Sequence, residues 1–135
     1  MTHPAALRRA GPGPDRLTVA LDLAAVLLFV GIGRHVHAHG LTLAGLASTA
    51  WPFLSGLAIG WLVLAARGQR GASFGGGLPV WLSTVAIGMA LRVVSGQGTA
   101  FAFVLVALGF LGATMLGGRA LLAGIRHRWA PGRAP

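Results

Sequence analysis

AGLASTAWPFLSGLAIGWLVLA, residues 44–65, is the stretch that decides the fold. It contains no charged side chain, and as an α-helix it would extend about 33 Å at about 1.5 Å per residue. The hydrocarbon core of a bilayer is about 30 Å thick. The stretch therefore predicts a transmembrane helix.

Three more apolar blocks of similar length, residues 17–33, 78–94 and 100–122, flank it. They lack the alternation of barrel strands, and backbone amides in lipid must be satisfied within their own segment. A composition that is 55% hydrophobic with two carboxylates also excludes an ordinary soluble domain. We expect an all-α fold, a polytopic four-helix transmembrane bundle over residues 17–122, between a disordered basic tail (1–16) and a second basic tail (123–135).

The net charge of +9 has a topological explanation, because the arginines gather at alternate ends of the predicted spans. They lie in the amino-terminal tail, between the second and third spans, and in the carboxyl-terminal tail. Basic residues in short flanks stay on the cytoplasmic side. We expect a multi-pass protein of the plasma membrane with both termini in the cytoplasm. A nucleic-acid surface would need these arginines on one face with stacking aromatics, so no nucleic-acid partner is expected.

Small residues at helical spacing predict how the spans associate, because lipid offers little hydrophobic driving force between helices. Gly56 and Gly60 form a GxxxG pair, Gly88 closes a small-xxx-small pair, and Gly109 and Gly117 belong to a ladder in the fourth span. Packing within one chain is the simpler interpretation. A face for a second copy or for another membrane protein is the alternative.

Two heptapeptides also match at five of seven positions: LSGLAIG at residues 54–60 and LSTVAIG at residues 82–88. Their spans run in opposite directions, so an inverted repeat of the kind found in transporters is one interpretation and coincidence is the other. Just before the first heptapeptide, Pro52 leaves the Ser48 carbonyl without its helical partner. The second span is either kinked at Pro52 or begins near it.

Ionisable residues inside a membrane are costly and point to function. Asp22 lies about 7 Å from the inner edge of the first span, and Arg119 lies about 28 Å from the outer edge of the fourth. The two residues share a similar depth, so we expect Asp22 to pair with Arg119 or with other polar groups of the inner side. A structural latch and a proton- or cation-coupled site are both consistent with such a pair.

The third intramembrane charge, Arg92, shares its depth with the outer end of the first span. We expect Arg34, His37 and Arg92 to converge there with Trp51, where no carboxylate is predicted. Such a cluster needs an anion, a lipid phosphate or carbonyl dipoles, because arginine's planar fork suits those acceptors. Outward snorkelling of separate side chains is the competing interpretation.

Three alternating histidines, His35, His37 and His39, offer an alternative metal site, because imidazole suits zinc, copper or nickel. No carboxylate or cysteine stands near them to complete it. We expect no metal and no other cofactor.

Several short motifs together resemble the domain of unknown function 3054 family, small four-span membrane proteins of actinobacteria. The resemblance covers roughly residues 17–122. The family carries no established activity, so it implies a fold and a set of residues but no function. The matching positions are Asp22, the G-R-x-x-H of Gly33, Arg34 and His37, the W-P-F of residues 51–53, Gly60, Trp61, Trp81, Gly88, Met89, Arg92 and the G-Q-G-T of residues 96–99.

These observations favour an integral membrane protein that binds or transports a small solute, ion or lipid. The predicted polar site comprises Asp22, Arg34, His37, Trp51 and Arg92, and the expected partners are the bilayer and an anionic lipid or small anion. The alternative is a structural or accessory subunit that docks another membrane protein through glycine-rich helix faces. The sequence contains no catalytic constellation, so we do not expect an enzyme.

Overall fold

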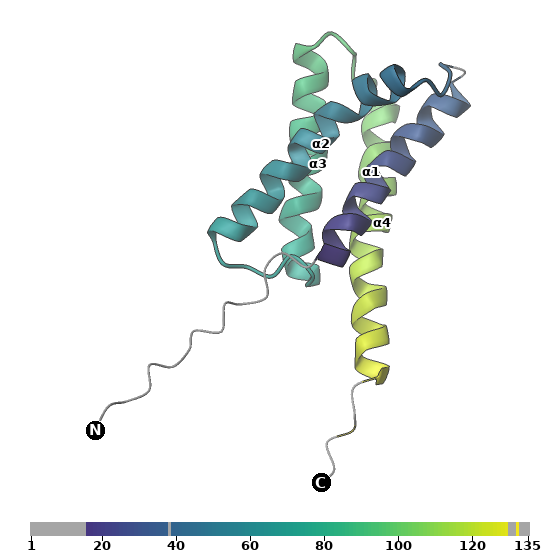
Figure 1. The fold of residues 1–135 in the computed structure, drawn as a ribbon. Helices are drawn as coiled ribbons and strands as arrows, with labels where there is room; N and C mark the ends of the chain where they lie inside the picture. Colours follow the sequence, from purple (N-terminus) through teal and green to yellow (C-terminus); the bar gives the residue numbers. More distant parts are fainter. Residues whose placement is uncertain (1–15, 38, 130–131, 133–135) are drawn as a thin grey trace.

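The computed structural model describes residues 16–37, 39–129 and 132 of the 135-residue chain. Within these residues every regular element is an α-helix and none is a strand. Each helix is long and apolar enough to span a membrane, which confirms the predicted fold class. The helices are α1 (Arg16–Val36), α2 (Leu43–Ala66), α3 (Phe74–Val94) and α4 (Phe101–Trp129), shown in Figure 1.

The helices run up and down in sequence and form a ring of neighbours. α1 packs against α2 and α4, and α3 packs against the same two helices, with the most extensive contact between α2 and α3. We call the end where α1 and α3 begin and α2 and α4 end the tail end. The opposite end, with the connections 37–42 and 95–100, is the clamp end.

The helix bounds differ from the predicted spans mainly at the tail end. α3 begins at Phe74, ahead of residue 78, and α4 continues to Trp129, beyond residue 122. Pro52 lies inside α2, so the interpretation in which the second helix starts near Pro52 is wrong. The predicted disordered tail falls almost entirely outside the described residues.

Side-chain caps start two of the helices. The Thr42 hydroxyl accepts a hydrogen bond from the Gly45 amide at 3.1 Å, and the Ser73 hydroxyl accepts one from the Gly76 amide at 3.0 Å. Each cap satisfies one of the backbone donors that a helix leaves free in its first turn. These caps explain why α2 and α3 begin where they do.

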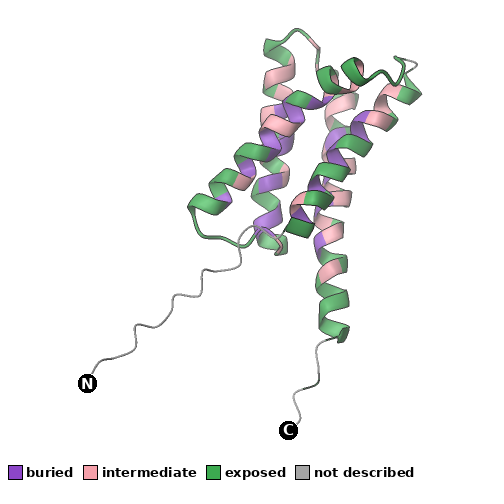
Figure 2. Cartoon of the chain, in the orientation of Figure 1, coloured by how far each residue is buried: buried purple, intermediate pink, exposed green. Residues whose placement is uncertain are grey.

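Phenylalanine side chains gather in the core toward the clamp end. Phe29 contacts Phe53 edge-on with ring centroids 5.5 Å apart, and Phe103 and Phe110 surround them. Such edge-on pairs add attraction beyond the burial of their area. Figure 2 shows buried residues on the helix faces that meet and exposed residues on the outer faces. Many of the exposed residues are large and apolar. Outward apolar side chains are compatible with contact to a lipid bilayer.

Glycines allow α2 and α3 to approach closely. A Cβ at Gly56 would lie 2.6 Å from the Ser83 carbonyl oxygen, and one at Gly60 would lie 3.0 Å from the Val80 Cα. A Cβ at Gly88 would meet the Phe53 ring. The Ser83 hydroxyl also donates to the Gly56 carbonyl at 2.8 Å. The matching heptapeptides therefore meet where their helices cross.

The glycines of α4 behave differently. A Cβ added at Gly109 or Gly117 would meet nothing within 4 Å, and both residues are exposed. The structure therefore places these two glycines outside the contacts between described helices. The sequence favours packing within one chain, but Gly109 and Gly117 take no part in it.

Candidate functional site

Asp22 of α1 and Arg119 of α4 form a buried ion pair near the tail end. Arg119 Nη1 donates to Asp22 Oδ1 at 2.8 Å, and Nη2 donates to Oδ2 at 2.7 Å. Asp22 is 1% exposed and Arg119 is 2% exposed. The predicted pairing is confirmed, with the two-bond geometry in which an arginine fork and a carboxylate bind most strongly.

Further donors and acceptors surround the pair. The Trp61 indole N–H of α2 donates to Asp22 Oδ2 at 3.0 Å. Arg119 Nε donates to the Gly71 carbonyl at 2.6 Å, and Nη1 also donates to the Met115 carbonyl at 3.0 Å. We call Asp22, Trp61, Gly71 and Arg119 the polar centre. It joins α1, α2, α4 and the connection between α2 and α3.

A glycine of α3 leaves room for the arginine. A Cβ at Gly77 would lie 2.5 Å from Arg119 Cδ, whereas one at Gly75 would meet nothing within 4 Å. Every helix of the bundle therefore contributes to the position of Arg119, three through contacts and α3 through a missing side chain.

Sequence reasoning did not identify Trp61 as a partner of Asp22. A tryptophan near the end of a span is typical of an interfacial anchor, but Trp61 turns its N–H inward to the carboxylate. The sequence did contain a signal for this contact. A buried carboxylate accepts several hydrogen bonds, and Trp61 is one of the few side chains at this depth, other than arginine, that can donate one.

At the clamp end, Arg34 binds the connection that follows its own helix. Nε donates to the Gly40 carbonyl at 3.0 Å and Nη2 to the His39 carbonyl at 2.9 Å. Nη1 donates to the Thr49 hydroxyl of α2 at 2.9 Å. Arg34 therefore holds the loop between α1 and α2 against the first turns of α2.

Arg92 repeats this arrangement at the end of α3. Nε donates to the Gly98 carbonyl at 3.2 Å and Nη2 to the Gln97 carbonyl at 3.2 Å, while Nη1 donates to Gln97 Oε1 at 3.0 Å. Its guanidinium also lies 4.5 Å from the centre of the Phe103 ring, a cation–π contact. We call Arg34 and Arg92, with the loop carbonyls that they bind, the two arginine clamps.

The clamps share a sequence pattern that was not recognised beforehand, R-x-V-x-x-x-G at residues 34–40 and 92–98. In both, Nε binds the carbonyl of the glycine six positions on and Nη2 binds the carbonyl before it. The glycines, Gly40 and Gly98, have φ of 76° and 78°, a region that side chains disfavour. The repeated pattern could have predicted both clamps.

A side-chain bridge links the second clamp to α2. The Gln97 side-chain amide donates to the Ser48 carbonyl at 3.0 Å. Pro52 removes the helical partner of that carbonyl, so Gln97 supplies the missing donor. The two clamps thus grip neighbouring residues of α2, Ser48 through Gln97 and Thr49 directly.

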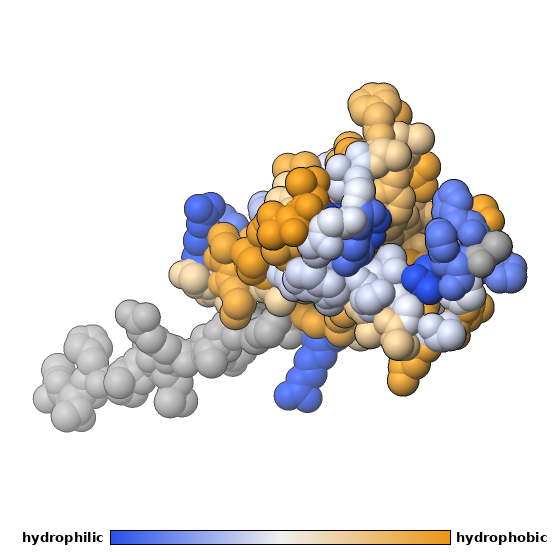
Figure 3. All heavy atoms as spheres, turned by 90° about the horizontal axis from the view of Figure 1, so that it is seen from above, coloured by the Kyte–Doolittle hydropathy of each residue, from blue (hydrophilic) through white to orange (hydrophobic). Residues whose placement is uncertain are grey.

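The outer site predicted from Arg34, His37, Trp51 and Arg92 is formed only in part. The arginines satisfy themselves with carbonyl dipoles, one of the acceptors that the sequence left open. His37 is exposed, and its described ring contact is with His39, 6.4 Å away between centroids. Trp51 is 41% exposed. Figure 3 shows polar side chains gathered over this end with apolar surface around them.

The described histidines do not come together as a metal site. Within residues 16–37 and 39–129, no three histidine or carboxylate side chains lie close enough to hold a metal ion. The alternative site of His35, His37 and His39 is therefore not formed in this structure.

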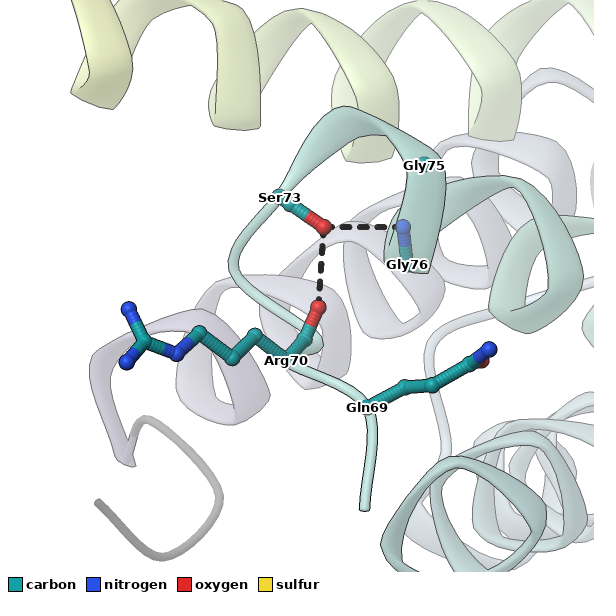
Figure 4. Close-up of a pocket in the computed structure, with 5 residues that line it drawn as sticks. All are labelled: Gln69, Arg70, Ser73, Gly75 and Gly76. Carbon is teal, nitrogen blue, oxygen red and sulfur yellow. Dashed lines mark hydrogen bonds between the residues drawn. The ribbon is translucent and has the colours of Figure 1, made fainter. Parts of the chain in front are cut away.

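A pocket of about 360 Å³ opens at the tail end, beside the start of α3. In Figure 4 the Ser73 hydroxyl bridges the Arg70 carbonyl and the Gly76 amide, and the Arg70 guanidinium extends away from them. The pocket borders the loop whose Gly71 carbonyl binds Arg119. Gln69 and Gly75 complete its lining.

Fold and site together define a small multi-pass helical protein with a buried ion pair at one end and two arginine clamps at the other. Residues 19–122 match the family described as "Protein of unknown function (DUF3054)". The chain belongs to this family, which confirms the resemblance seen in its motifs. No curated protein and no solved structure matches the chain.

Proposed function

We propose that the protein binds or moves a small ion or solute through the polar centre. The observation that supports this proposal is the burial of both charges of the Asp22 and Arg119 pair. Replacement of a buried ion pair by apolar residues of similar volume is often neutral or stabilising. Stability alone therefore does not account for two charges inside the bundle, and intramembrane charges commonly lie on the path of an ion or proton.

The proposed site is narrower than the one expected from the sequence. Arg34 and Arg92 each use three of their five N–H groups on loop carbonyls and on the Thr49 or Gln97 side chain. These two arginines hold the connections at the clamp end, and the ion or solute binds at the tail end.

The orientation is part of the proposal: the tail end faces the cytoplasm and the protein lies in the plasma membrane. The described residues at this end include the exposed arginines Arg16, Arg67, Arg70, Arg126 and Arg128, as expected for a cytoplasmic side. The chain contains no cysteine, so single cysteines report topology cleanly. Gly132→Cys should resist a membrane-impermeant maleimide added to intact cells, and Ser95→Cys should react; the reverse pattern would overturn the orientation.

The function is tested with purified protein in vesicles. Proton, sodium and chloride fluxes are measured under an imposed potassium diffusion potential, in wild type and in the double variant Asp22→Asn with Arg119→Gln. The double variant removes both charges, so it avoids an unpaired buried charge. We expect a flux in wild type that falls to the level of empty vesicles in the double variant.

The matched control is Arg34→Gln with Arg92→Gln, which removes two charges at the clamp end. This control should keep the flux if the tail end carries the function. If the double variant Asp22→Asn with Arg119→Gln folds and retains full flux, the ion pair is a structural latch and the proposed function is wrong.

A second function, docking to another membrane protein, is favoured by α4. Gly109, Ala113 and Gly117 form an outward row of small residues, and such rows let transmembrane helices approach closely. Gly56 and Gly60 are already used by α3, so this alternative now rests on α4. Crosslinking in cells should lose a partner when this row is made bulky, as in Gly109→Leu and Gly117→Leu; an unchanged pattern would remove this alternative.

A further inference from the structure

Thr18 is a buried polar residue that the polar centre does not use. It is 1% exposed, and its hydroxyl has no hydrogen-bond partner in the structure. An unsatisfied buried hydroxyl is unfavourable, and native proteins usually satisfy one with protein or water. Thr18 therefore needs an explanation that the ion pair alone does not give.

Its position points to the carboxylate. Thr18 precedes Asp22 by four residues in α1, so both side chains lie on one face of the helix. Their Cβ atoms are then about 5–6 Å apart. One water molecule with two hydrogen bonds of about 2.8 Å spans such a gap.

The polar centre has free hydrogen-bonding capacity for such a water. Asp22 Oδ1 accepts one bond, from Arg119 Nη1. The bonds of Arg119 to Asp22, Gly71 and Met115 use four of the five N–H groups of a guanidinium and leave one on Nη2. That N–H points away from the paired carboxylate. The water therefore has two polar partners, Asp22 Oδ1 and the Thr18 hydroxyl, within the range of two to four partners found for buried waters.

We propose that Thr18 binds a water that carries protons between the tail end and Asp22. This inference rests on the proposed function and names the proton as its ion. A hydronium at the tail end gives a proton to the water, and the water gives one of its own to Asp22 Oδ1. One O–H bond of the hydronium breaks as one forms on the bound water, and another O–H bond of that water breaks as one forms on the carboxylate. The reverse steps release the proton.

Among the described residues, the charged group that faces Asp22 is Arg119 of α4. From α2 it meets the neutral indole of Trp61, and the loop after α2 contributes the Gly71 carbonyl to Arg119. Thr18 is a positioning residue for this water.

Infrared difference spectroscopy after a pH jump tests the proposal. The chain contains two side-chain carboxylates, so Asp15→Asn leaves Asp22 as the one that remains. In that background we expect a band from a strongly hydrogen-bonded internal water and a carboxylic-acid band from Asp22. Thr18→Val should abolish the water band and slow the rise of the acid band by about tenfold, as expected for the loss of one hydrogen bond on the path.

Two further variants test whether the hydroxyl of residue 18 is responsible. Thr18→Ser keeps a hydroxyl and should retain both signals, and Thr18→Ala repeats the loss if the valine variant fails to fold. Thr84→Val is the matched control, because Thr84 is equally buried but its hydroxyl donates to the Val80 carbonyl of its own helix at 2.7 Å. This control should leave the water band and the rate unchanged.

The contrary outcome is equally clear. If Thr18→Val raises the melting temperature and leaves both bands intact, the hydroxyl is dry and the proposal is wrong. The proposed function fails separately: vesicles without flux of any tested ion overturn it even if Thr18 holds a water. Proton flux that depends on Asp22 but is indifferent to Thr18 overturns the water route and leaves the function standing.

Discussion

The two ends of the bundle place arginine in opposite surroundings. At the tail end, Arg119 is buried and its charge is matched by a carboxylate from a distant helix. At the clamp end, Arg34 and Arg92 are partly exposed, and their acceptors include backbone carbonyls of the loops that directly follow them. One end joins helices through full charges, and the other shapes loops through dipoles.

The difference has an energetic consequence. A buried charge that loses its partner carries a large desolvation penalty, whereas a partly exposed arginine that loses a carbonyl turns to water. Damage at the tail end should therefore spread to the whole bundle. Damage at the clamp end should remain local.

The largest effect is expected from breaking the ion pair on one side. Arg119→Gln leaves the Asp22 carboxylate buried without a positive charge, and Asp22→Asn leaves Arg119 without a negative one. Each should lower the free energy of unfolding by about 3–5 kcal/mol. Denaturation in mild detergent, followed by circular dichroism, measures the loss.

The double variant Asp22→Asn with Arg119→Gln is the control for this first prediction. It should be more stable than either single variant, because no unpaired charge remains. If the single variants unfold at the wild-type denaturant concentration, the pair is not buried in the way described and the contrast between the two ends disappears.

A second prediction concerns the space that Gly77 leaves for Arg119. Gly77→Ala places a methyl group against Arg119 Cδ and should cost about 1–3 kcal/mol, as overpacking does. Gly75→Ala is the matched control two residues away, with open space, and should be neutral or slightly stabilising. Thermal melting of both in the same detergent compares them, and equal melting temperatures would refute the close contact.

The bridge of the second clamp should have a smaller effect. Gln97→Ala removes a donor to the Ser48 carbonyl and an acceptor of Arg92, which should cost about 1–2 kcal/mol. Hydrogen exchange should rise in residues 43–51, the turns of α2 ahead of Pro52, and stay unchanged at the tail end. Gln69→Ala, an exposed glutamine at the other end, serves as the control. Faster exchange throughout the bundle would show that the effect of damage at the clamp end is not local.

The smallest effect is expected at the turning glycine of the first clamp. Gly40→Ala must adopt a φ of 76° and should cost about 1 kcal/mol. Gly31→Ala, in the same half of the molecule but within α1 and with open space around it, should gain a few tenths instead. The two melting curves should shift in opposite directions; a shared direction would mean that the loop tolerates another shape.

Much of the fold could be predicted because each membrane span corresponds to a long apolar block in the sequence. Depth along a span is also nearly linear in residue number, and for this reason Asp22 and Arg119 could be matched before their helices were placed. The start of α3 was missed, because Phe74 to Gly77 form a glycine-rich turn of helix whose sequence favours a loop.

Rotation about a helix axis was harder to predict than depth. Gly109 and Gly117 have the spacing of a packing face, but nothing in α4 alone says that this face turns outward. Likewise, Trp61 lies at the depth of an interfacial anchor and turns inward. Loop conformation was harder still, since the arginine clamps depend on glycine dihedral angles that hydropathy does not encode.

The long separation between Asp22 and Arg119 has a consequence for biogenesis. The partners are 97 residues apart in the chain, so α1 is synthesised well before α4. At about 5–20 residues per second, the carboxylate waits roughly 5–20 s for its arginine. During that interval the carboxylate of the first helix has no partner, so a chain truncated before residue 119 should be less stable than the full chain.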